Sequence, residues 1–162
     1  MRLEVDDSGS VALATVGQRI RATLLDLSLC ALTSSILVKT LLAGSISGMT
    51  TVKRQVVSGL VFTLLLGVDE VLMIGLRGRT LGNEVTKTAV VHADDLSAVS
   101  MVQAVLRFFA GPMVFCLGSI VLWLIPYVIV DHAFAARGGT MQTLHDRAAR
   151  TVVVVVDTSE TD

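Results

Sequence analysis

Three long apolar blocks constrain this chain more than any other feature of its sequence. They run over residues 22–38, 55–76 and 108–130. The first block contains one charged residue, Asp26, the second contains only the adjacent pair Asp69 and Glu70, and the third contains none. About 20 mainly apolar residues suffice for a helix to cross a membrane, and a soluble chain of 162 residues could hardly bury three such helices. The sequence therefore predicts an all-helical integral membrane protein with three hydrophobic helical segments.

Composition excludes several other classes of protein. Charged residues make up 17% of the chain, against about 25% in soluble domains. The 13 basic and 14 acidic residues nearly cancel, which argues against a nucleic-acid partner. The two cysteines, Cys30 and Cys116, have no metal-ligand or disulfide spacing. We expect no enzymatic activity, cofactor or metal. The expected partner is the lipid bilayer, with a homo-oligomer or another membrane protein as open alternatives.

The third apolar block cannot be one straight helix. From residue 101 to 134 such a helix would measure about 50 Å, well beyond a hydrocarbon core of about 30 Å. Pro112 removes a backbone donor and disfavours helix at Gly111, so the break is predicted there. We expect an interfacial or half-inserted helix over 101–110, carrying Arg107, and a hydrophobic helix over 113–130. Trp123 and Tyr127 then lie near its end, where aromatic belts form.

Two short β-branched runs lie outside the apolar blocks. Residues 85–91 and 151–156 read as strands that could pair outside the membrane. The expected organisation is a polar tail over residues 1–18, a membrane domain over 19–156 and a second polar tail over 157–162. Basic residues precede the first block and follow the second, which favours a multi-pass protein of the cell membrane with a cytoplasmic N-terminus. The basic C-terminal segment favours the same side for the C-terminus, whereas a plain third crossing would place it outside.

Three groups of residues in this chain resemble the motifs of one membrane-protein family. They are Arg19, Ala22 and Leu25-Asp26; Glu70-Val-Leu with Gly78-Arg-Thr-Leu-Gly82 and Ala89-Val-Val91; and Gln142-Thr-Leu-His-Asp-Arg147 with Thr151-Val-Val153. In this order they resemble the RDD family of small bacterial membrane proteins, over roughly residues 17–156. The chain departs from the family pattern at Asn83, where Lys is usual, and at Ala149-Arg150, where Ala-Gly is usual.

The resemblance implies which residues give the family its name. The one Arg and two Asp fall on Arg19, Asp26 and Asp146 of this sequence. The function that the resemblance implies is the transport of unidentified ligands. Asp146 lies outside the apolar blocks, so we expect it to cap a helix or a turn and to pair with Arg147 or a basic loop.

Polar residues also form seams along the first two predicted helices. Arg19 and Asp26 are seven residues apart, hence on one helical face with Thr23, Cys30 and Thr33, and this face must turn toward protein or water. On the second helix a face of small residues ends in an acid and predicts close helix packing. Its members are Gly59, Thr63, Gly67 and Glu70.

In an antiparallel hairpin the intramembrane carboxylates reach the same level. Asp26 lies seven residues from Arg19 and Glu70 seven residues from Arg77, so both sit about 10 Å deep. Asp69 lies close to that level. One interpretation is a transport site in which Arg19 and these three acids handle a proton or a cation. The other is a structural clamp, in which Arg19 and Arg107 neutralise Asp26 and Glu70. The clamp is the simpler interpretation, because intramembrane polar pairs often only hold helices together.

Overall fold

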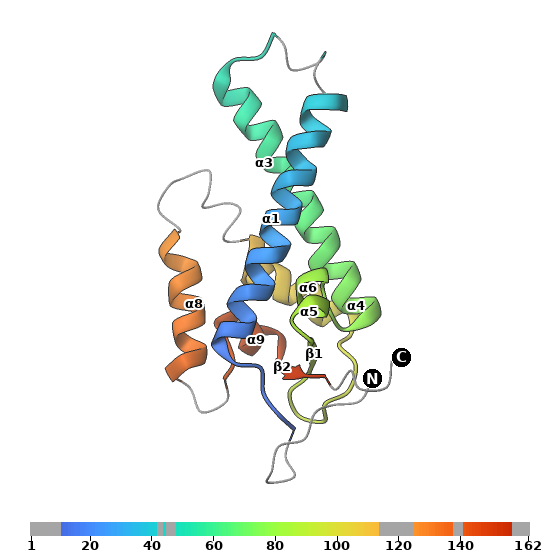
Figure 1. The fold of residues 1–162 in the computed structure, drawn as a ribbon, viewed down its shortest axis with the longest axis vertical. Helices are drawn as coiled ribbons and strands as arrows, with labels where there is room; N and C mark the ends of the chain where they lie inside the picture. The colour runs from blue at the N-terminus through green and yellow to red at the C-terminus, as the bar shows by residue number, and fades with distance from the viewer. Residues whose placement is uncertain (1–10, 42–43, 45–47, 114–124, 138–140, 157–162) are drawn as a thin grey trace.

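The fold is built on a long helical hairpin, which stands upright in Figure 1. The computed structural model describes residues 11–41, 44, 48–113, 125–137 and 141–156. The first arm is α1 (Val16–Leu41), which begins with a capping box between Thr15 and Gln18. The second arm is a continuous rod of α3 (Thr51–Gly67), a π-helical segment η1 (Val68–Met73) and α4 (Ile74–Arg77). Both arms are long and apolar enough to cross a membrane.

Burial separates the two faces of α1 as the sequence pattern predicts. Along one face the side chains of Arg19, Asp26 and Cys30 are buried. On the opposite face large apolar side chains are exposed, and they are Leu24, Leu25, Leu29, Leu32 and Ile36. The prediction that the polar seam turns toward protein is confirmed. The exposed leucines form the surface that lipid would cover.

Short elements gather at one end of the hairpin (Figure 1). They are α5 (Leu81–Val85), β1 (Thr88–His92), α6 (Met101–Ala110), α8 (Ile125–Arg137), α9 (Leu144–Ala149) and β2 (Thr151–Val155). Helix α6 has the predicted bounds, and Gly111 is its C-cap residue. Strand β1 begins three residues later than predicted, because Thr80 caps a short helix that continues to Val85. Of the predicted helix 113–130, residues 114–124, including Trp123, lie outside the described residues, and Tyr127 belongs to α8.

Strand β2 pairs with β1 and also bonds to residues 12–14, which precede α1. Strands β1 and β2 pair antiparallel, with Val90 opposite Val153. The N–H of Ala14 donates to the carbonyl of Val153 at 3.0 Å, and the N–H of Val155 donates to that of Ala12 at 2.9 Å. Residues 12–14, expected in a polar tail, therefore pack against β2. They also place β2 at the same end of the hairpin as the start of α1.

The units α5–β1 and α9–β2 are alike in sequence and in structure. Each has a Thr N-cap, a Leu, a basic residue at positive φ and a fully buried Thr, at one common spacing of 63 residues. The members are Thr80, Leu81, Lys87 and Thr88 in the first unit, and Thr143, Leu144, Arg150 and Thr151 in the second. Val90 and Val153 are equivalent by the same spacing, and they face each other across the sheet. An approximate two-fold axis therefore passes between the two strands at this pair.

Candidate functional site

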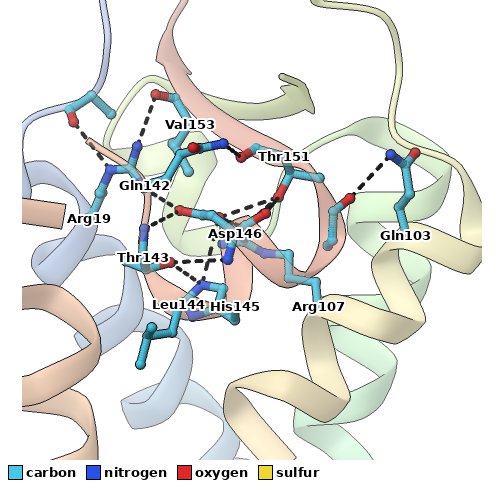
Figure 2. A network of polar contacts seen from close by, with 12 residues as sticks. Arg19, Gln103, Arg107, Gln142, Thr143, Leu144, His145, Asp146, Thr151 and Val153 are labelled. Carbon is cyan, nitrogen blue, oxygen red and sulfur yellow. Dashed lines mark hydrogen bonds and ion pairs between the residues drawn. The ribbon is translucent and has the colours of Figure 1, made fainter. Parts of the chain in front are cut away.

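Asp146 is the centre of the polar network drawn in Figure 2. Its side chain is fully buried. Atom Oδ2 accepts a hydrogen bond from Arg19 Nη1 at 2.6 Å, and Oδ1 accepts one from Arg107 Nη1. The backbone N–H of Thr143 donates to the same carboxylate at 3.2 Å. One carboxylate thus binds two guanidinium groups, which come from α1 and α6.

The position of Asp146 follows from the local structure of α9. Thr143 and Asp146 form a capping box, in which each side chain accepts from the other residue's backbone N–H. The expected capping role is thus present. The expected pairing with Arg147 is wrong, because Arg147 is exposed while Arg19 and Arg107 reach the carboxylate from inside the fold. Arg19 is 127 residues away from Asp146 in the sequence, and Arg107 is 39 residues away. No local sequence pattern could therefore predict these partners.

Asp26 has a different set of partners from the one expected. Its Oδ2 accepts from the Thr80 hydroxyl at 2.7 Å, and its Oδ1 accepts from the Gly82 N–H at 2.6 Å. The proposed ion pair between Arg19 and Asp26 is wrong, because the Arg19 guanidinium extends instead to Asp146 and to the carbonyls of Ala14 and Val153. Asp26 therefore anchors the first turn of α5 to the middle of α1.

Gly82 makes that anchor sterically feasible. A Cβ atom at this position would lie 2.2 Å from the backbone oxygen of Ala22 and 2.8 Å from both carboxylate oxygens of Asp26. Any larger residue would push α5 away from α1 and break the hydrogen bond to Asp26. The close approach of the α5 and α1 backbones thus explains why the last residue of the Gly78–Gly82 motif is a glycine.

Asp69 and Glu70 lie on the π-helical segment η1. Such segments are rare and often occur at functional sites. Asp69 interacts with Asp26 and with the backbone N–H of Leu81. Glu70 Oε2 lies 3.6 Å from Arg107 Nε, which exceeds hydrogen-bond length. Within the described residues, Asp69 Oδ2 and Glu70 Oε2 are buried atoms without a hydrogen-bond partner. Of the expected clamp, only this ion pair between Arg107 and Glu70 is present, and it is longer than a hydrogen bond.

The small residues of the second arm do not mediate the helix packing that we expected. A Cβ on Gly59 would meet nothing within 4 Å. A Cβ on Gly67 would lie 3.2 Å from the ring of Phe108, so this glycine faces α6 and not α1. The prediction that these glycines mediate a close α1–α3 contact is wrong, because Gly59 faces open space and Gly67 faces Phe108 of α6.

A cavity of about 60 Å³ lies among these side chains. Its polar lining comes from both arms of the hairpin and from the later helices, and includes Asp26, Glu70, Arg107, Asp131, His132 and His145. This space suits a few water molecules or one small cation. The three acids that the sequence brings to one level, Asp26, Asp69 and Glu70, thus lie together at or beside a polar cavity.

Asp131 and His145 are site residues that the sequence reasoning missed. Asp131 Oδ1 accepts from the backbone N–H of Leu144 at 2.9 Å, and its Oδ2 lies 2.8 Å from His145 Nδ1. Burial lowers the pKa of His145 to about 4, and the nearby Arg107 charge adds to this effect, while Asp131 opposes it. The imidazole is therefore neutral at pH 7. Asp131 accepts from the first N–H of α9, and Asp69 makes the similar contact with the first N–H of α5, but the two acids are 62 residues apart and do not match the 63-residue spacing.

Acidic groups outnumber basic groups around the cavity. The acids are Asp26, Asp69, Glu70, Asp131 and Asp146, and the guanidinium groups are those of Arg19 and Arg107. Both guanidinium groups bind Asp146, and that of Arg107 also lies 3.6 Å from Glu70, whereas Asp26 and Asp131 accept from hydrogen-bond donors. No cluster of three or more metal-ligating side chains is found in the part of the chain that the structure describes.

The hairpin consists of two candidate membrane-spanning helices, and charged side chains are buried along its inner faces. The model of the RDD family matches residues 13–150, and the chain belongs to this family. The resemblance seen in the three motifs is thereby confirmed. Comparisons with curated proteins and with solved structures found no match. In this chain, two residues of the family's name, Arg19 and Asp146, pair with each other, whereas Asp26 binds α5.

Proposed function

We propose that this RDD protein transports protons, or a small cation, and that Asp26, Asp69 and Glu70 form the site that binds them. The observation that carries the proposal is the pair of buried carboxylate oxygens, on Asp69 and Glu70, that have no hydrogen-bond partner among the described residues. A buried carboxylate oxygen that accepts no hydrogen bond is costly when the group is ionised, so it favours a proton or a bound cation. The small cavity supports a proton or a small cation over an organic solute.

Arg19 acts in this transport site through Asp146 and does not itself bind the proton or cation. Arg19 and Arg107 hold Asp146, and Arg107 in turn lies beside Glu70. Protonation of Glu70 would weaken its attraction to Arg107 and leave that guanidinium to Asp146. The Arg107 side chain is therefore the link by which the charge on Glu70 affects the packing of α6 and α9.

In the orientation that we propose, the end of the hairpin that carries β1 and β2 lies on the cytoplasmic side of the cell membrane. Exposed basic residues lie in or beside the elements at this end, among them Arg21, Arg77, Lys87, Arg147 and Arg150. Short loops on the cytoplasmic side of membrane proteins carry such an excess of Lys and Arg. Both the start of α1 and strand β2 would then lie on that side.

Proton and cation flux into sealed vesicles that contain the purified protein tests the transport proposal. Glu70→Gln keeps the size of the side chain and removes only a loose contact, so it should fold and should lose most of the pH-dependent flux. Glu84→Gln is the matched control, because Glu84 lies 3.4 Å from Arg79 on the surface and outside the cavity. Unchanged flux in Glu70→Gln and in Asp69→Asn, or absence of flux in the wild type, would refute the proposal.

A structural role without transport is the second candidate, and the buried contacts of Asp146 favour it. It predicts no flux in any version of the protein. It also predicts that Glu70→Gln changes the free energy of unfolding, since a clamp acts only through stability. Measuring unfolding and flux on the same variants therefore separates the two candidates.

A further inference from the structure

A groove of about 670 Å³ opens between the first turns of α1 and the α5–β1 connection. It lies apart from the acidic cavity, and no residue lines both. The charged residues of its lining are basic, Arg21 from α1 and Lys87 from the connection. Its apolar lining comes from Leu24, Leu25 and Val85. The groove therefore combines positive charge with an apolar wall.

Both basic side chains are available to a ligand. Arg21 is exposed, and its Nε donates to the carbonyl of Gly17 at 3.2 Å, whereas its two terminal nitrogens have no hydrogen-bond partner among the described residues. Lys87 is also exposed. Among the described residues neither Arg21 nor Lys87 has an acidic partner within ion-pair distance. An anion in the groove would meet two unpaired cations.

The backbone holds Lys87 in a fixed and unfavourable conformation. Its φ is 54°, in the left-handed region that is unfavourable for a residue with a side chain. Its N–H donates to the carbonyl of Glu84 at 3.3 Å, and its carbonyl accepts from the N–H of Val156 at 2.9 Å. Glycine or asparagine is the ordinary choice at such a position. The fold thus sets where the backbone of Lys87 lies beside the groove, and its flexible side chain can reach a ligand there.

The groove also lies at a defined level of the hairpin. Leu24 and Leu25, 57% and 43% exposed, begin the lipid-facing stripe that continues along α1 through Leu29. Arg21 lies one turn nearer to the start of α1, at the end where the basic residues gather. Headgroup phosphates and the first methylenes of the acyl chains meet at this kind of boundary.

We propose that the groove binds the headgroup of an anionic phospholipid. The phosphate lies between Arg21 and Lys87, and an acyl chain follows Leu24 and Leu25 toward the middle of the membrane. Charge complementarity and the apolar wall together favour a lipid over a free anion, because a free anion would use only the basic side chains. This inference does not depend on the transport proposal.

Native mass spectrometry of the purified protein, with phosphatidylglycerol or phosphatidylcholine added to the same detergent, tests the inference. The wild type should retain phosphatidylglycerol in preference to phosphatidylcholine. Each juxtamembrane basic residue contributes about fivefold to such binding, so Arg21→Gln and Lys87→Gln should each lower the affinity about fivefold, and together about 25-fold. Both residues are exposed, so the variants should fold.

Arg150→Gln is the matched control. Arg150 is the repeat equivalent of Lys87, it is exposed, and its φ of 52° is nearly the same, but it does not line this groove. Its substitution should leave the lipid preference unchanged. Equal retention of the two lipids by the wild type would overturn the inference, as would an equal loss of preference in Arg150→Gln. Displacement of the lipid by millimolar inorganic phosphate would also overturn it, since it would indicate a site for free phosphate.

Discussion

Replacing Asp146 with Ala should destabilise the protein more than any other single change at the polar network. The carboxylate is fully buried and accepts from Arg19, Arg107 and the N–H of Thr143. Its removal leaves two guanidinium groups buried near each other without their shared counter-charge. Breaking a buried ion pair by removing one partner typically costs about 3–5 kcal/mol. Loss of the capping contact to Thr143 adds about 1 kcal/mol.

The assay is reversible unfolding in detergent micelles, followed by circular dichroism as denaturant increases. Asp146→Asn keeps an acceptor and the cap geometry, so its loss should be smaller than that of Asp146→Ala. Arg147→Ala is the control, because this neighbour is exposed and should change the free energy of unfolding by about 0.5 kcal/mol or less. In a double-mutant cycle, Arg19→Met with Asp146→Ala should cost less than the two single losses added together. A loss below about 1 kcal/mol for Asp146→Ala would refute the reasoning, since no buried pair costs so little to break.

Two further predictions concern the short helices. Gly82→Ala should destabilise by about 1–3 kcal/mol, since its Cβ would overlap the carbonyl of Ala22, whereas Gly59→Ala, whose Cβ meets nothing, should be near neutral in the same unfolding assay. Folding lowers the pKa of His145 from 6.5 to about 4, so between these pH values the unfolded chain binds a proton that the folded chain does not. The free energy of unfolding should therefore fall as the pH drops through this window, by about 3 kcal/mol in total, and His145→Gln should flatten that part of the pH profile. An unfolding profile of His145→Gln that matches the wild type between pH 7 and 4 would contradict the assignment.

Much of the helical framework could be predicted from the sequence because the signals are local. The apolar blocks over 22–38 and 55–76 predict the two long arms, since the backbone in lipid must satisfy its own hydrogen bonds. The break after residue 110 follows from Gly111-Pro112, because proline cannot continue the hydrogen-bond ladder. The inward direction of Asp26 and Arg19 follows from the cost of exposing a charge to lipid. Each of these features can be predicted from a short stretch of neighbouring residues.

The partners of the charged residues were decided by the tertiary structure alone. Seven-residue spacing places Arg19 and Asp26 on one face of α1, and this suggested a pair, but Arg19 binds Asp146 and Asp26 binds Thr80 and Gly82. A long side chain can choose among several acids within its reach, and the packing of α5 and α9 against the hairpin settles that choice. Periodicity assigns a residue to a face of its own helix. Only the assembled fold determines which distant segment comes to cover that face, because that depends on chain segments more than fifty residues away.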